Sequence, residues 1–324
     1  MRRTTDSSLP SLALALASVL GPGCDLPVEP EEFELREGDP GVEGTWPPSG
    51  GTLNTAVLNG STLMRIIPPN APASCQGSDA CITEIEVMSG GQHVLATAAT
   101  SEQGDLVVVA EGIEYRGATL VDSRWWLDPA HTAYVTITEF AQEQGHFGYQ
   151  FEHRVVEGAS IRPVICEPDE DGDQWAYVVG DVNVDPGTAE ISVDHGALAI
   201  ACASGALGKA ISWGFSPWKN GHVHDTKFYQ AGLRTVMADY CGDGSSYTVD
   251  GTVIQVSNER AGQTFFDPAA STEAVFGPDG ALCLSSPRII GAGAQCSIPT
   301  CGSDESVQGM TTQSFRVWTK IPPS

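Results

Sequence analysis

The stretch TAYVTITEF, residues 132–140, has the residue pattern of a half-buried β-strand. Apolar residues stand at Ala133, Val135 and Ile137, and tyrosine or threonine occupies the positions between them. Because successive side chains of a strand point to opposite faces, this alternation places one set against a core and the other toward solvent. The stretch therefore predicts a domain built around β-sheet.

Similar patterns occur on both sides of it, separated by Gly, Pro, Asp and Asn, which favour turns. They are DLVVVAEG (105–112), GYQFEHRVV (148–156), AEISVD (189–194) and GTVIQVSN (251–258). The segment AVFGPDGALCL (274–284) predicts a hairpin, since its Pro-Asp-Gly turn lies between two apolar arms. We expect a mainly β or α+β fold with antiparallel strands.

Two segments of the C-terminal half change to helical periodicity: SGALGKAISWGF (204–215) and TKFYQAGLRTVMADY (226–240). In the second, Leu233, Val236, Met237 and Tyr240 form one apolar stripe, and Cys-Gly-Asp-Gly follows as the expected end of the helix. Ser204 precedes the first helix, where an N-cap is a better interpretation than a nucleophile. The expected architecture is an antiparallel β-rich domain with two short helices in its C-terminal half.

The N-terminus has the features of an export signal. Arg2 and Arg3 precede an apolar stretch at 9–20, which is too short to span a bilayer but typical of a signal peptide. Small residues then lead to Cys24, in a pattern that resembles the lipobox of bacterial lipoproteins, where the cysteine is acylated after cleavage. Gly21 stands where that pattern usually has leucine, so an ordinary secretory signal is the alternative.

The cysteine count favours acylation of Cys24. The chain has nine cysteines, and removing Cys24 leaves an even set that can pair fully in an oxidising compartment. No C-x-x-C pair is present, which argues against zinc. The sequence does not decide the connectivity; the pairs we expect are Cys75–Cys81, Cys166–Cys202, Cys241–Cys283 and Cys296–Cys301.

The chain divides into a signal peptide (1–23), a tether (24–52), a β-rich N-terminal part (53–160) and a C-terminal part (161–324). After Cys24 the tether holds eight acidic residues and one basic residue among many Pro and Gly, too polar to form a core. The formal net charge of −25 repels phosphate backbones, so a nucleic-acid partner is not expected. Membrane attachment would come from the acyl chains on Cys24.

One segment carries a family resemblance. Ala238, Asp239, Tyr240 and Cys241, followed by Gly242-Asp243-Gly244, resemble the ADYC domain family, which is found mainly in predicted lipoproteins of Gram-negative bacteria. The likeness extends over about 166–283. It includes the run GFSPW at 214–218, but Ala210 and Gly232 stand where relatives often have cysteine. The family is one of unknown function, so the resemblance implies no activity and no catalytic residues.

The residues of this motif favour a structural role. Gly242 and Gly244 allow the positive φ angles of a tight exit from a helix. Asp239 and Asp243 can accept hydrogen bonds from turn amides, and Tyr240 can fill the core if its hydroxyl finds a partner.

Two clusters could hold a metal. Asp169, Asp171 and Asp173 alternate as in calcium loops, although the glycine and glutamate of an EF-hand are misplaced, so a solvated acidic turn is the preferred interpretation. His222 and His224 would share one face of an extended segment but lack a third ligand. We expect no cofactor, with calcium as the remaining alternative.

The common catalytic motifs are absent from the sequence. Trp213, Phe215 and Trp218 could line a groove, but packing between helix and sheet is the simpler interpretation. We expect an exported, lipid-anchored envelope protein on the outer membrane or the periplasmic face, with a binding or structural role toward an unknown envelope or extracellular ligand. The alternative is a cell-wall or polymer-modifying hydrolase, which would need Asp239, Asp243 or His222 to converge in a cleft.

Overall fold

The structure is a computed structural model. It describes residues 52–71, 80–143, 146–156, 164–169, 172–218, 225–258, 260–261, 265, 267–289, 295–311 and 315–323. The expected signal peptide, Cys24 and almost all of the tether lie outside these residues. The described elements all belong to one unit, Thr45–Ser324.

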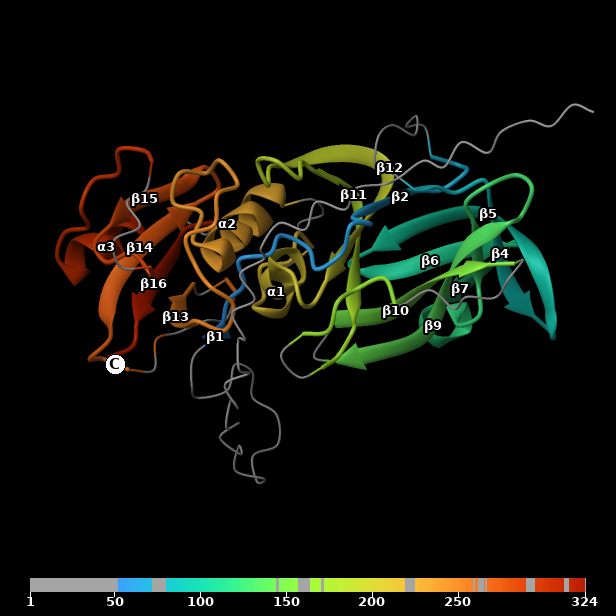
Figure 1. Ribbon diagram of the computed structural model, residues 1–324, viewed down its shortest axis with the longest axis horizontal. Coiled ribbons are helices and arrows are strands. Elements are labelled where there is room, and N and C mark those ends of the chain that lie inside the picture. The colour runs from blue at the N-terminus through green and yellow to red at the C-terminus, as the bar shows by residue number, and fades with distance from the viewer. Residues whose placement is uncertain are drawn as a thin grey trace, which may run out of the picture. The chain divides into compact units, whose positions relative to one another are not determined.

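The larger sheet has eleven strands in the order β3-β2-β12-β11-β10-β9-β8-β4-β5-β6-β7 (Figure 1). Their bounds are β2 (Arg65–Ile67), β3 (Ala80–Cys81), β4 (Glu84–Ser89), β5 (Gln92–Glu102), β6 (Asp105–Ala110), β7 (Ile113–Arg116), β8 (Arg124–Trp126), β9 (Ala133–Glu143), β10 (His146–Val155), β11 (Ala176–Val184) and β12 (Ile191–Cys202). Neighbours pair antiparallel except β2 and β3. The sheet curls so that β5 approaches β11, although the two are distant in the strand order; Ser101 of β5 donates a hydrogen bond to the carbonyl of Val178 on β11 at 3.0 Å.

The strand predicted at 132–140 is confirmed as β9. Val135 and Ile137 are buried in the core of the larger sheet, where Trp125 and Phe151 from the flanking strands also lie. Thr136 points to the opposite face and is nevertheless buried. The reason is that β9 is an interior strand, with β8 on one side and β10 on the other.

The smaller sheet has the order β1-β13-β16-β14-β15. Its strands are β1 (Thr52–Leu53), β13 (Val253–Ser257), β14 (Ser271–Gly277), β15 (Gly280–Leu284) and β16 (Val317–Ile321). The predicted hairpin at 274–284 is confirmed, since Gly277 pairs with Gly280 across the turn. The fold class is therefore the expected strand-rich one with antiparallel sheets.

Both predicted helices form, as α1 (Ala206–Ser212) and α2 (Thr226–Met237). A third helix, α3 (Asp304–Met310), and a 3₁₀ turn, η1 (Gly117–Leu120), were not predicted. The apolar stripe of Leu233, Val236, Met237 and Tyr240 is buried as expected, but burial extends to all ten residues at 228–237. The helix is covered by α1, by β12 of the larger sheet and by β14 and β16 of the smaller sheet.

The expected N-cap of the first helix, Ser204, is wrong. Gly205 caps α1 without any side-chain hydrogen bond, and the Ser204 hydroxyl is buried with no partner among the described residues. A side chain on Gly205 would collide with the backbone of Asn59 at 2.4 Å. Close approach of another segment thus decides how this helix begins.

Three disulfides are described. Cys166–Cys202 is confirmed, but the other two pairs are Cys241–Cys296 and Cys283–Cys301, so the expected Cys241–Cys283 and Cys296–Cys301 are wrong. The physical reason is that β15 directs Cys283 into a small core with Trp318, which the segment before α3 also enters. Cys81 is disulfide-bonded as well, and its expected partner, Cys75, lies outside the described residues.

The aromatic residues after α1 pack as expected. Trp213 and Phe215 are buried in the core between the two sheets, and the partly buried Trp218 packs against it. The ring of Phe215 lies 5.2 Å from that of Phe228 on α2. Among the described residues, no helix is long and apolar enough to cross a membrane.

Candidate functional site

The motif of the family resemblance forms a turn at 238–244, which we call the ADYC turn. The helix before it ends at Ala238, which adopts left-handed angles (φ 51°, ψ 38°) and is wholly buried. We expected the stop a few residues later, at Cys-Gly-Asp-Gly. An alanine in this conformation is unfavourable by roughly 1–2 kcal/mol, so the surrounding contacts must hold it there.

Asp239 organises the ADYC turn. Its carboxylate accepts hydrogen bonds from the amides of Gly242 at 2.8 Å, Asp243 at 3.2 Å and Gly244 at 2.8 Å. The guanidinium of Arg234 on α2 pairs with the same carboxylate. Burial raises the pKa of Asp239, and the charge of Arg234 and the turn amides oppose that rise. The predicted role of Asp239 in accepting turn amides is confirmed.

The ADYC turn joins elements of both sheets. Arg234 also donates to the carbonyl of Thr188, in the β11–β12 connection, at 2.7 Å. Gly242 (φ 70°) lies so close to the β14–β15 hairpin that an added Cβ would stand 2.1 Å from the carbonyl oxygen of Asp279. Gly244 (φ 87°) approaches the carbonyl of Gly187 in the same way, at 2.7 Å.

Tyr240 takes part in a fully buried ion-pair network. Its hydroxyl donates to Glu273 Oε1 at 2.8 Å and accepts the backbone N–H of Arg288 at 2.9 Å. The Arg288 guanidinium donates to the same Glu273 oxygen at 2.7 Å, and to the carbonyls of Thr235 and Val236 at 2.6 and 3.0 Å. Both charged side chains are 0 % exposed. Arg288 therefore satisfies carbonyls at the end of α2, and the predicted need of Tyr240 for a partner is confirmed.

Every residue of the Ala-Asp-Tyr-Cys tetrapeptide thus has a structural role, since Cys241 forms the disulfide to Cys296. Asp243 is exposed and accepts the amide of Ser245 at 2.9 Å. Asp239 and Asp243, proposed in the hydrolase alternative, are both engaged in holding the turn. His222 lies outside the described residues.

The candidate metal ligands are only partly described. The Oδ1 of Asp169 accepts the amide of Asp173 at 2.9 Å, as in an ordinary acidic turn, and Asp171 lies outside the described residues. His222 and His224 also lie outside them. Over the part of the chain that is described, no group of three or more possible ligands could hold a metal ion.

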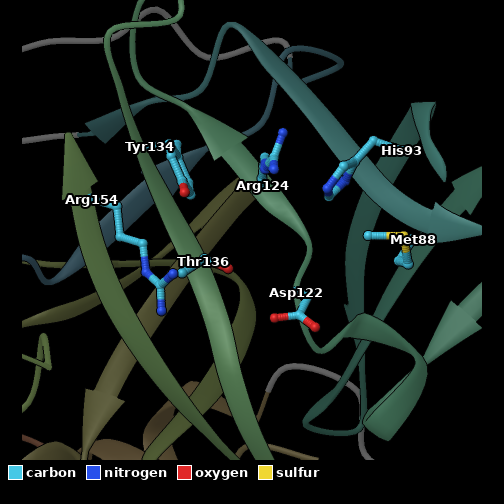
Figure 2. Close-up of a pocket in the computed structure, with 7 residues that line it drawn as sticks. All are labelled: Met88, His93, Asp122, Arg124, Tyr134, Thr136 and Arg154. Atoms are coloured by element: carbon cyan, nitrogen blue, oxygen red, sulfur yellow. The ribbon is translucent and has the colours of Figure 1, made fainter. Parts of the chain in front are cut away.

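A pocket of about 150 Å³ lies elsewhere, on the outer face of the larger sheet (Figure 2). Seven residues line it: Met88, His93, Asp122, Arg124, Tyr134, Thr136 and Arg154. They come from strands β4, β5, β8, β9 and β10 and, for Asp122, from the turn before β8.

Strand pairing explains why these side chains meet. Arg124 on β8 lies between Glu86 of β4 and Thr136 of β9 in the antiparallel register. In the same way Tyr134 pairs with Arg154 of β10. Successive side chains of a strand point to opposite faces of the sheet, so the residues between the buried core residues of these strands point outward. The pocket therefore depends on the register of the paired strands, which cannot be predicted from a short sequence motif.

The arginines of the pocket differ in how they are held. Glu152 accepts from Nε and Nη2 of Arg154 at 3.0 and 2.8 Å, and this pairing raises the pKa of Arg154. Arg124 has its nearest acid, Glu86, at 3.9 Å, beyond hydrogen-bond distance, and lies 5.7 Å from the centre of the Tyr134 ring. One guanidinium is thus satisfied, and the other is left with its donors available.

The comparisons with known proteins give one finding. A family model described as the ADYC domain matches residues 117–290, more than half of the chain. Comparison with curated proteins and with solved structures found no match. The matched region holds the ADYC turn, its ion-pair network and five of the seven pocket residues. The chain belongs to the ADYC domain family.

Proposed function

We propose that this protein is an exported, lipid-anchored module of a bacterial envelope that binds a ligand and needs no resident cofactor. The observation that carries the proposal is the set of three described disulfides, which tie β12, the ADYC turn and β15 each to a segment outside the strands. Such bonds persist in oxidising compartments and are rare in the cytosol. On a chain-entropy model, loops of 36, 55 and 18 residues contribute roughly 4, 4 and 3 kcal/mol.

Anchoring is supported by the one cysteine that the pairing does not need. Seven of the nine cysteines are disulfide-bonded in the described residues, and Cys75 would complete an even set of eight. Cys24 is then free for acylation, at the end of a stretch with the composition of a signal peptide. The acidic tether after it would separate the domain from the outer-membrane or periplasmic membrane surface that carries it.

Binding is favoured over catalysis by what the polar groups do. The carboxylate of Asp239 binds turn amides and Arg234, and that of Glu273 binds Tyr240 and Arg288. Both carboxylates therefore have structural roles. The pocket of Figure 2, in contrast, presents polar groups that are open to solvent. A concave site with a few converging polar groups is the usual place for a small ligand.

Mass spectrometry of the mature N-terminus tests the anchoring. We expect the chain to begin at acylated Cys24, and to accumulate in its uncleaved form when cells are treated with globomycin. The Cys24→Ser variant should lose the lipid and leave the membrane fraction, whereas Ser61→Ala should not. Cleavage at another residue, or an unmodified Cys24, would remove the lipid anchor from the proposal.

A further inference from the structure

We propose that the pocket of Figure 2 binds a small zwitterion, a molecule carrying one carboxylate and one ammonium group, such as an amino acid. The inference deepens the proposed binding role and rests on it. Three lining residues carry the argument: Arg124, Asp122 and His93.

Arg124 supplies the site for the carboxylate. Its side chain is 39 % exposed and makes no hydrogen bond within the described residues, with Glu86 Oε2 at 3.9 Å as its ion-pair partner. The strand pairing of β8 with β4 and β9 fixes where this side chain leaves the sheet. A planar guanidinium presents parallel N–H donors that match the two oxygens of a carboxylate.

Asp122 supplies the site for the ammonium. It is exposed, and its carboxylate has no hydrogen bond or ion pair to any described residue. Its backbone is nevertheless fixed at φ 66°, with its amide donating to the carbonyl of Ile137 at 2.9 Å. Figure 2 shows its carboxylate and the Arg124 guanidinium at separate positions around the pocket. The two opposite charges remain apart, each available to a ligand.

His93 and Met88 complete the wall. They are directly paired between β5 and β4, and the buried Nδ1 of His93 has no partner among the described residues. An imidazole nitrogen there can exchange a hydrogen bond with a polar group of the ligand. The thioether of Met88 offers an adaptable apolar contact for its carbon chain.

The charge balance selects a zwitterion over a simple ion. Arg124 and Arg154 are positive, while Asp122 and the neighbouring Glu86 and Glu152 are negative. A phosphate would meet a site with no net positive charge, in a chain of net charge −25. A simple cation could pair with the Asp122 carboxylate but would leave the guanidinium of Arg124 without a hydrogen-bond acceptor. A molecule with one charge of each sign satisfies both free groups.

The size of the pocket points to a small ligand. Its volume of about 150 Å³ lies below the ~300–1,000 Å³ that is usual for sites of drug-sized molecules. We therefore expect a ligand on the scale of a free amino acid.

Calorimetric titration of the full chain, purified from membranes in detergent, tests the proposal. The probes are glycine, β-alanine and 4-aminobutyrate, which place the two charges at increasing separation. N-acetylglycine lacks the ammonium and glycinamide lacks the carboxylate. The protein variants are Arg124→Gln and Asp122→Asn. Glu111→Gln is the matched control, because Glu111 is also exposed with a positive φ of 52°.

We expect at least one zwitterion to bind with a dissociation constant of about 1 mM or tighter, and removal of either charge to weaken binding by about tenfold. Each pocket variant should cause a similar loss, with the Glu111→Gln variant unchanged. Equal affinity for N-acetylglycine or glycinamide would overturn the proposal, as would unaltered binding in both pocket variants.

The same assay separates this inference from the binding role beneath it. If no zwitterion binds but phosphate, a dicarboxylate or a monosaccharide does, and Arg124→Gln abolishes that binding, the zwitterion proposal fails and the binding role stands. If none of these probes binds at up to about 100 mM, a concentration that would reveal even very weak affinity, both fail.

Discussion

The buried pair of Arg288 and Glu273 allows a sharp test of how the ADYC turn is held. Both side chains are 0 % exposed, and the Arg288 guanidinium also donates to two carbonyls at the end of α2. Removing one partner leaves the other charge buried without compensation, a loss of typically 3–5 kcal/mol. We therefore expect Arg288→Met and Glu273→Leu each to destabilise the domain by about that amount.

The double variant Arg288→Met/Glu273→Leu should cost much less than the sum of the two single changes. Neither charge is then buried, and apolar side chains of similar volume can be close to neutral at such sites. The double variant still loses the hydrogen bond from the Tyr240 hydroxyl to Glu273 and the hydrogen bonds from Arg288 to two carbonyls at the end of α2. We expect these losses to destabilise the domain by about 1–3 kcal/mol. The coupling energy between the two positions should therefore exceed about 2 kcal/mol.

Urea unfolding followed by tryptophan fluorescence, with the disulfides kept intact, measures these differences. Asp194→Asn is the control, because its pair with Arg65 is partly exposed and should be worth about 1 kcal/mol or less. Additive single losses, to within about 0.5 kcal/mol, would show that the two charges do not act as one buried unit.

Three further predictions follow from other contacts. Gly242→Ala should lower the midpoint of unfolding strongly, because the new Cβ would stand 2.1 Å from the carbonyl of Asp279; an unchanged midpoint would contradict this close approach. Hydrogen bonding to Lys320 lowers the pKa of Asp304 in the folded protein below its ordinary 3.8. The contribution of this pair to the free energy of unfolding is therefore present above pH 3.8, and it is lost as the pH falls through the pKa of Asp304 in the folded protein. An NMR titration should show this, and Lys320→Met should move the pKa back toward 3.8. Calcium titrated into the wild type and into Asp169→Asn should give identical heats, since the Asp169 carboxylate already accepts the amide of Asp173; a calcium heat that the variant abolishes would restore the metal site.

Much of the fold could be predicted from local patterns. The alternation around Val135 identified β9, and the Pro-Asp-Gly turn identified the β14–β15 hairpin, since both depend on neighbouring residues alone. The helix α2 was found from its apolar stripe, but its complete burial depends on a second sheet that the stripe does not encode. The 3.6-residue period reports only that one face is buried.

Long-range pairings could not be predicted in the same way. The partners of Cys241 and Cys283 depend on where distant segments pass, so proximity in sequence was a poor guide. The pocket was missed because its residues meet only through the register of five strands. The sequence does indicate that Arg124 and Tyr134 point outward, because they alternate with the apolar Trp125 and Val135 of the same strands. The roles of Asp239 and Tyr240 were predictable because each follows from turn chemistry and burial.

The residues by which this family is recognised occupy the place where the β11–β12 connection meets the β14–β15 hairpin. These residues are required for the fold, so they can stay the same while the residues on the exposed face of the larger sheet change. Chains collected by the tetrapeptide would then share a scaffold without sharing a ligand. Specificity within the family should be sought in the outward residues of β4, β8 and β9, which the signature does not include.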